Sequence, residues 1–283
     1  MKNSAWFKYF SLTTIWIWLG VFAIIPTLMI VAASFLSHSS QDLLKLPFTF
    51  SNYEQLFNIV FLKVFWRSLT IAFFCTLICL LIGYPFAYGV ARTKKPYNTL
   101  LLLLIMIPFW TSSLIRTYAI MTLLKSKGLI NSLLLSLGLI HQPLELLYSK
   151  LAVFIGLSYD LLPFMILPLY ASIEKLDNTL IEAAHDLGAK KLRVFFKIIV
   201  PLTMPGIISG SLLVFLPAMT LFYIPVLLGG AKSMLLGNLI ENQFLQLTNW
   251  PVGSASSTLL IVLIGLLIFL YLPFAKRQDR KVQ

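Results

Sequence analysis

Residues Glu174–Pro205 read EKLDNTLIEAAHDLGAKKLRVFFKIIVPLTMP and separate two long apolar runs of the chain. Thr179 followed by Glu182 fits a capping box, and Asp177 is a second candidate N-cap, so a helix is expected to begin here. Good helix formers continue until Gly188, which lets a chain turn sharply because it has no Cβ. The first half of the stretch therefore predicts a short helix that ends in a glycine corner.

The second half of the stretch predicts an amphipathic helix from about Lys190 to Ile199, which ends at Pro201. Its apolar residues recur at spacings of three and four, namely Leu192, Phe195, Phe196 and Ile199. Between them lie basic residues that can meet anionic lipid headgroups. Composition alone therefore supports a membrane-surface connector at least as well as a docking element for a partner protein.

The composition of the whole chain indicates a membrane protein. Of its 283 residues, 59% are hydrophobic and only 11% are charged, and the mean hydropathy is +0.89. An ordinary soluble domain carries about 25% charged residues. A soluble protein with so little charge would expose large apolar patches to water. We therefore expect an all-α integral membrane protein.

Six apolar stretches approach the roughly 20 residues that a helix needs to span the hydrocarbon. They are Ser11–Leu36, Leu62–Ala91, Thr99–Leu124, Leu151–Ile173, Ile207–Leu228 and Ala255–Phe274. The first follows two lysines, as a signal peptide would, but its apolar run is too long, so we interpret it as a retained anchor. Prolines within the spans predict bent helices. Leu129–Ile140 is expected to form a short interfacial helix that begins near Asn131.

The distribution of basic residues indicates the orientation of the chain. Most of the 22 Lys and Arg lie at the two termini, after the second span and between the fourth and fifth spans. Because basic loops remain in the cytoplasm, both termini and the Glu174–Pro205 stretch are predicted to lie there. The formal net charge of +12 is thus explained mostly by topology and does not indicate nucleic-acid binding.

One pattern within Glu174–Pro205 resembles the EAA loop of bacterial ABC importer permeases. Its residues are Glu182, Ala183, Ala184, Gly188, Ile198 and Pro201, with Val200 where the family has leucine. The pattern lies in the predicted cytoplasmic loop before the penultimate span, where the family places it. The resemblance implies a type I ABC importer permease fold of six transmembrane helices, in which the helix around Asn178–Leu187 couples to a separate ATPase.

An ATP site is not expected in the chain itself. A Walker A loop requires Gly, four residues and then Gly-Lys-Ser/Thr. The nearest match, Gly229–Ser233, has Ala231 where the second glycine must stand. We therefore expect a non-catalytic subunit that binds no cofactor, with ATP and Mg used by the partner ATPase.

Further blocks resemble the permeases of bacterial spermidine/putrescine importers, in particular the first of their two membrane subunits. These blocks are Pro108–Tyr118, Leu162–Tyr170, Ser172–Asp177, Pro201–Gly206, Leu216–Met219, Gly229–Lys232 and Trp250–Pro251. The resemblance implies transport of polyamines across the bacterial inner membrane. Its implied partners are a second permease subunit, two copies of an ABC ATPase, a periplasmic polyamine-binding protein and membrane lipid, with no nucleic acid.

The spans and the resemblance together predict three parts of the chain. An N-terminal transmembrane helix and first periplasmic loop occupy residues 1–61. The importer transmembrane domain follows at 62–274, with the coupling loop at 174–205. A cytoplasmic tail covers 275–283.

Asp160 is the one carboxylate predicted near the middle of a span. An ionisable side chain there costs roughly 2.5–3.5 kcal/mol on insertion scales, so it needs a function or a partner. It can contact a cationic cargo, with Tyr159, Trp110 and Tyr118 supplying aromatic surface. It can equally form a structural pair with Arg116 or a hydrogen bond to a backbone carbonyl that a proline leaves free. For Arg116 itself, near the outer end of its span, snorkelling or partner docking is expected.

Other interpretations remain open. The aromatic residues also fit an interfacial belt or a packed core. The same architecture could import phosphate, sulfate, ferric ion or a sugar, although an anion would suit Asp160 poorly. A gradient-driven transporter would show inverted repeats and several coupling carboxylates. An enzyme is disfavoured because His38, His141 and His185 lie in different loops and form no known catalytic motif.

Overall fold

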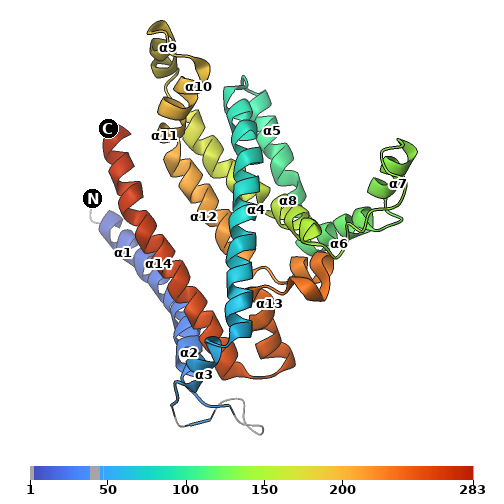
Figure 1. The fold of residues 1–283 in the computed structure, drawn as a ribbon. Coiled ribbons are helices and arrows are strands. Elements are labelled where there is room, and N and C mark those ends of the chain that lie inside the picture. Colours follow the sequence, from blue (N-terminus) through green and yellow to red (C-terminus); the bar gives the residue numbers. More distant parts are fainter. Residues whose placement is uncertain (1–2, 39–44, 47, 283) are drawn as a thin grey trace. The chain divides into compact units, whose positions relative to one another are not determined.

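The computed structural model describes residues 3–38, 45–46 and 48–282, and every regular element in these ranges is a helix, apart from an isolated bridge between Ser37 and Lys45 (Figure 1). The chain divides into two compact units. One combines Met1–Lys63 with Leu239–Leu267, and the other combines Val64–Asn238 with Ile268–Gln283. The expected all-α fold is confirmed, and each unit is described by itself below.

The α-helices follow one another along the chain with short connections. They are α1 (Asn3–Leu19), α2 (Ile25–Ser34), α3 (Ser51–Leu56), α4 (Ile59–Arg92), α5 (Tyr97–Met106), α6 (Ser113–Leu124), α7 (Leu129–Ser136), α8 (Lys150–Glu174), α9 (Asn178–Asp186), α10 (Lys191–Val194), α11 (Val200–Leu202), α12 (Met204–Thr220), α13 (Leu236–Glu241) and α14 (Trp250–Val282). π-Helical turns cover Gly20–Ile24, Phe195–Ile199, Pro225–Gly229 and Asn242–Gln246, and 3-10 turns cover Ile107–Trp110 and Gly230–Ser233.

Within the described residues, four helical segments are long and apolar enough to cross a membrane. They are Lys8–Ser34, Ile59–Arg92, Lys150–Glu174 and Trp250–Phe269. Two further bent pairs, Tyr97–Trp110 with Ser113–Ser136 and Lys191–Leu202 with Met204–Thr220, raise the number to six if each pair is one span. The structure thus has four to six candidate spans, in agreement with the predicted number.

The third predicted span, Thr99–Leu124, is bent, as its proline predicts, and the bend is a complete break in the helix. The helices on either side of its middle meet at 91°. Pro108 lies in a 3-10 turn, and Thr111 after it is extended at φ −94° and ψ 147°, so the helical hydrogen bonds cannot continue into α6. The bend lies directly before Ser113, the first residue of α6.

The fifth predicted span, Ile207–Leu228, is also interrupted. Helix α12 ends at Thr220, and Leu221 is extended at ψ 119°. Asn238 of α13 donates its side-chain N–H to the Phe222 carbonyl at 2.7 Å and so holds the residues directly after the end of α12. The segment therefore turns away from the axis of α12 before the π-helical turn at Pro225–Gly229.

Close packing of α8 on α12 forms the core of the second unit. Gly206 and Gly210 line the contact from α12. A Cβ at Gly206 would lie 2.5 Å from the Ser172 Cβ, and one at Gly210 would lie 2.9 Å from the Met165 sulfur. Both glycines are therefore required for the helices to approach, as small residues are at many helix contacts in membranes.

Helix α7 confirms the short helix that was expected over Leu129–Ile140. It begins two residues before the predicted start at Asn131 and is followed by Gly138 in a left-handed conformation at φ +67°. The Asn131 side chain is buried and hydrogen-bonds the backbone of Leu144 in both directions, at 2.8 and 2.9 Å. Asn131 is thus a tie between α7 and the loop that follows, and not its N-cap.

In the other unit, α1 and α2 form one long helical segment that continues through the π-helical turn at Gly20–Ile24. The apolar window of Lys8–Ser34 has no buried residue. Large side chains such as Trp16, Phe22 and Met29 are 66% exposed. A water-soluble chain could not leave such a surface uncovered, whereas lipid or a partner helix covers it at no cost.

Candidate functional site

The predicted coupling helix is α9, and Asp177 caps it. The Asp177 carboxylate accepts a hydrogen bond from the Thr179 backbone N–H at 2.9 Å. This bond favours the ionised form and holds the pKa of Asp177 below its ordinary value. Of the two N-caps that the sequence allowed, the structure selects Asp177, one residue before α9.

Gly188 ends α9 in a left-handed conformation at φ +78°. The Gly188 N–H donates to the His185 carbonyl at 2.8 Å, and the Ala189 N–H donates to the Ala184 carbonyl at 3.0 Å. These two bonds form a Schellman motif, which places glycine at this position because other residues are strained there. The predicted glycine corner is present in the structure.

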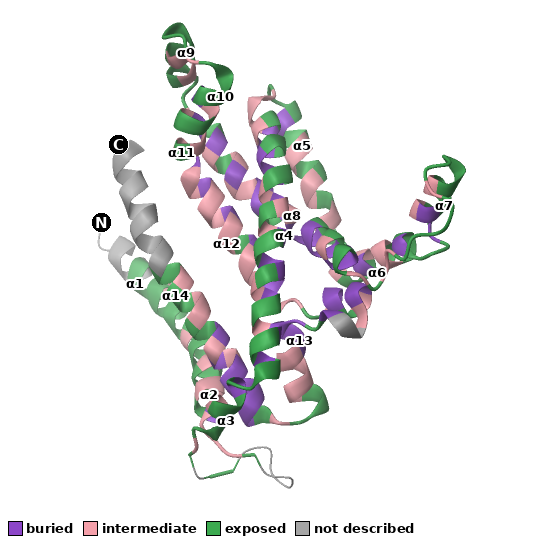
Figure 2. Cartoon of the chain, viewed as in Figure 1, coloured by how far each residue is buried: buried purple, intermediate pink, exposed green. Residues whose placement is uncertain are grey.

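The face that α9 presents is open within this chain, and none of its residues is buried (Figure 2). Glu182 and Ala183 are exposed, and Ala184 is half-buried. Leu187, just beyond the helix, is 89% exposed. A small-residue face with an uncovered leucine beside it has the shape and chemistry of a surface that another protein covers.

The helix after the corner differs from the predicted amphipathic pattern. Val194 and Ile199 are buried, whereas Leu192 and Phe196, expected on the apolar face, are 74% and 65% exposed. The π-helical turn at Phe195–Ile199 shifts the positions within and after it around the axis, whereas Leu192 lies before this turn, in the four-residue α10. Of the remaining motif residues, Ile198 is half-buried and Pro201, in α11, is exposed. The residues after the glycine corner are thus divided between the core and the surface, and the helical period changes within this segment.

Two side chains of α4 that sequence reasoning did not identify attach the α9–α11 segment to this helix. Arg92, at the end of α4, donates a hydrogen bond to the Asn178 side chain at the start of α9, and its guanidinium lies 5.3 Å from the Tyr88 ring centroid. Tyr84, two turns earlier, lies 2.8 Å from the Thr203 hydroxyl and packs edge-on against Phe195. Helix α4 therefore holds the hairpin of α9 and α10 at both ends.

Asp160 lies on α8 and is 8% exposed. Its Oδ1 is 2.8 Å from Arg116 Nη2, and the two side chains are each 11% exposed. Ser113 donates to Oδ1 at 2.6 Å and Tyr223 donates to Oδ2 at 3.4 Å, while their hydroxyls lie 2.8 Å apart. We call these four residues the Asp160 cluster. Its contacts supply the partners that a carboxylate in the hydrocarbon needs.

Arg116 is therefore not a snorkelling residue, and that part of the expectation was wrong, whereas partner docking stays a prediction. Its guanidinium carbon lies 5.4 Å from the Phe109 centroid and 5.9 Å from the Tyr159 centroid, within cation–π range. The bend before α6 turns the first turn of this helix toward α8, so that Arg116 reaches Asp160 instead of the interface. The structural pair that was one of two alternatives for Asp160 is present.

The predicted aromatic residues are only partly brought together. Tyr159 joins the Asp160 cluster through Arg116 and is 46% exposed, whereas Trp110 and Tyr118 are 84% and 54% exposed. Ser113, Tyr223 and Phe109 were missed by sequence reasoning. Ser113 could have been found, because it lies three residues before Arg116 on one helix face. Tyr223 lies far from Asp160 in the sequence, and no local sequence pattern predicts their contact.

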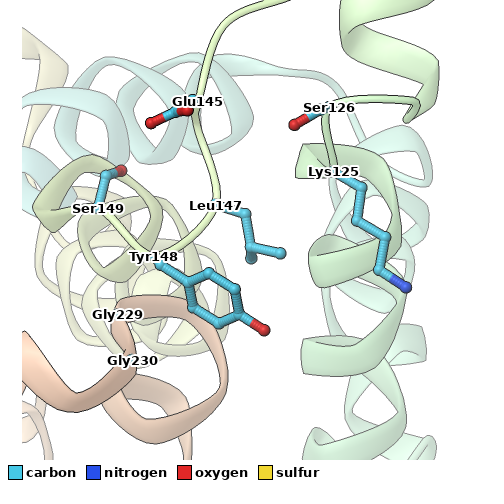
Figure 3. Close-up of a pocket in the computed structure, with 8 residues that line it drawn as sticks. All are labelled: Lys125, Ser126, Glu145, Leu147, Tyr148, Ser149, Gly229 and Gly230. Atoms are coloured by element: carbon cyan, nitrogen blue, oxygen red, sulfur yellow. The ribbon is translucent and has the colours of Figure 1, made fainter.

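A separate pocket of about 870 Å³ lies between the end of α6, the loop before α8 and the Gly229–Gly230 turn (Figure 3). It is lined by Lys125, Ser126, Glu145, Leu147, Tyr148, Ser149, Gly229 and Gly230. Gly230 is left-handed at φ +62°, and a Cβ there would lie 3.1 Å from the Tyr148 ring. The predicted site residues do not line this pocket. Elsewhere in the described ranges, groups of three or more His, Cys, Asp or Glu that could hold a metal ion are absent.

Comparison with known proteins gives a consistent result. Residues 79–283 match the family model described as binding-protein-dependent transport system inner membrane component. The chain is 50% identical over 277 residues to the spermidine/putrescine transport system permease protein PotB of Haemophilus influenzae, covering 98% of this chain and 97% of that protein. It is 48% identical over 266 residues to PotB of Escherichia coli, covering 94% and 97%.

Solved structures agree on the fold. A bacterial ABC transporter involved in the import of the acidic polysaccharide alginate matches with a TM-score of 0.77 at 18% identity, covering 97% of this chain and 96% of that one. The MetNI methionine ABC transporter in an inward-facing conformation matches with a TM-score of 0.56 at 16% identity, covering 77% and 95%. The chain therefore belongs to the binding-protein-dependent transport system inner membrane components, and it is a membrane permease with the fold of an ABC importer subunit.

Proposed function

We propose that the chain forms half of a pathway for spermidine and putrescine in an ATP-driven importer of the bacterial inner membrane. The observation that carries the proposal is the identity of 47–50% over 94–100% of this chain with relatives named as spermidine/putrescine permeases. The chemistry agrees, because a polyamine is a flexible cation and the Asp160 cluster holds a carboxylate beside the aromatic rings of Phe109 and Tyr159.

The energy for transport is proposed to come from a separate ATPase that docks on α9. This proposal is supported by the open face of α9, with Glu182, Ala183 and Ala184 on it, and by the corner at Gly188. Closure of two ATPase copies would move α9 and, through Arg92 and the α10–α11 segment, the spans behind it. ATP and Mg are used in that partner, and this chain is the non-catalytic subunit.

The remaining partners and the topology are proposed on the same basis. A second, related permease would complete the pathway as a heterodimer, with apolar surface of the Lys8–Ser34 helix facing it or lipid. A periplasmic polyamine-binding protein would deliver the cargo. Both termini and α9 would lie in the cytoplasm, as the basic residues indicate. The parts proposed at residues 1–61, 62–274 and 275–283 follow from this topology.

Uptake by cells tests this function. In a strain that lacks this chain but keeps its partner subunits, the wild-type chain should restore uptake of labelled spermidine and putrescine. Labelled phosphate and sulfate serve as controls for another cargo. Failure to restore polyamine uptake at a matched membrane level, or restoration of one of the other solutes instead, would contradict the proposal.

A further inference from the structure

The surroundings of Arg116 have the chemistry of a cation site that a side chain of the protein itself occupies. Its guanidinium lies against the Asp160 carboxylate at 2.8 Å and within 5.4 and 5.9 Å of the Phe109 and Tyr159 ring centroids. A carboxylate beside two aromatic rings is also a favourable setting for an alkylammonium ion. The paired Arg116 and Asp160 side chains are each 11% exposed, and Tyr159 beside them is 46% exposed.

The oxygen atoms around this position suit an ammonium group. Asp160 offers two carboxylate oxygens, and the Ser113 and Tyr223 hydroxyls lie within hydrogen-bond distance of them. An ammonium has three N–H donors, whereas a guanidinium has five. Arg116 Nε is buried and has no hydrogen-bond partner among the described atoms. The resident guanidinium is thus only partly satisfied, so an ammonium could replace it without leaving more donors unpaired.

The position also lies where two bent spans meet α8. Ser113 and Arg116 belong to the first turn of α6, directly after the 91° bend. Tyr223 follows the end of α12, where that helix turns away. Asp160 of α8 contacts the residues that follow each of these two bends. A change of cation on Asp160 therefore changes the contacts that hold both bends.

We propose that Arg116 is a built-in substitute for the cargo and that an ammonium group of a polyamine replaces its guanidinium on Asp160 during transport. The inference rests on the polyamine function proposed above. Without cargo, the pair leaves no free carboxylate for small inorganic cations. With cargo, Arg116 is released from α8 and the contact between α6 and α8 loosens.

Spermidine binding to the complete importer complex in lipid nanodiscs tests the exchange. The variants are Arg116→Gln, Asp160→Asn and the double variant, with Thr122→Val as a control, since the exposed Thr122 hydroxyl bonds only the backbone of its own helix. Arg116→Gln frees the carboxylate and should lower the Kd for labelled spermidine about tenfold. The gain should be absent in Asp160→Asn, in the double variant and in Thr122→Val.

A second measurement keeps the test decisive if Arg116→Gln assembles poorly. Spermidine should then raise the yield and the thermal midpoint of this complex toward those of the wild type, because it supplies the missing cation. It should not do so for the double variant. An Arg116→Gln complex that spermidine neither binds more tightly nor stabilises overturns the inference.

The double variant separates exchange from a purely structural pair. If the pair only neutralises charge, removing both charges should restore assembly and uptake together. The exchange predicts restored assembly with uptake at least about tenfold below wild type, so wild-type uptake by the double variant overturns it. If the wild-type complex transports no polyamine at all, the proposed function fails first and independently.

Discussion

Single residues of this chain show how charge and backbone conformation are matched to their surroundings. Asp160 is stable in the hydrocarbon because Arg116, Ser113 and Tyr223 all reach its carboxylate. Removing one member of a buried ion pair leaves the other charge uncompensated and costs roughly 3–5 kcal/mol in soluble proteins. Gly188 is suited to its position by its backbone conformation, because φ is +78° and few residues other than glycine adopt this value without strain.

Gly188 can be tested without altering any side-chain contact. A Cβ at this position would meet nothing within 4 Å, so the effect of a substitution comes from φ alone. Gly188→Val should cost about 1–2 kcal/mol in the local conformation and weaken coupling, whereas Gly188→Asn should be tolerated. The measurement is the amount of ATPase that co-purifies with each variant, together with transport-stimulated ATP hydrolysis. Equal behaviour of the two variants would contradict a role for the left-handed corner.

Among the elements, α9 depends on its attachment to α4. Arg92 bonds Asn178 at the start of α9 and lies over the Tyr88 ring. A helix of this length has little stability of its own, so its orientation must come from such ties and from its caps. In the proposed importer, the path from a docked ATPase to the spans would therefore run through the end of α4 as well as through α10 and α11.

Arg92→Ala should loosen α9 by about 0.5–1.5 kcal/mol, the usual net value of one hydrogen bond. Hydrogen exchange of the α9 amides in the assembled complex should become faster, and transport per ATP hydrolysed should fall. Lys94→Ala is the matched control, because it removes a neighbouring exposed positive charge outside this tie. If the α9 amides exchange at the same rate in both variants and transport per ATP is also equal, Arg92 acts only through its charge. The hydrogen bond between Arg92 and Asn178 is then unimportant.

The elements also indicate which features the sequence could predict. The short α9, its glycine corner and four of the spans follow from local patterns of capping, glycine and apolar length. Prolines in the spans predicted bends, but not that the helix would break before Ser113 or end at Thr220, because a proline in a span is compatible with a kink or a break. The π-helical turn at Phe195–Ile199, which contains the exposed Phe196, was likewise not predicted. Tyr223 joined Asp160 only through the fold.

For the whole molecule, membership of the importer permease family explains why so much apolar and functional surface is uncovered in one chain. The Lys8–Ser34 helix has no buried residue in its apolar window, and α9 has none at all. In the importer that we propose, the Lys8–Ser34 surface would meet lipid or the second permease, and the α9 surface would meet the ATPase. The account thus depends on this chain converting ATP-driven movement of α9 into movement of polyamine past Asp160.

ATP-driven accumulation of labelled spermidine in proteoliposomes that contain the complete complex tests this claim most directly. We compare the wild type with Glu182→Lys, on the open face of α9, and with Glu54→Lys, an exposed carboxylate on α3, as control. The account predicts accumulation only with ATP in the wild type and in Glu54→Lys, and a loss of accumulation in Glu182→Lys while Asp160-dependent spermidine binding is retained. Accumulation without ATP, or wild-type accumulation in Glu182→Lys, would contradict it.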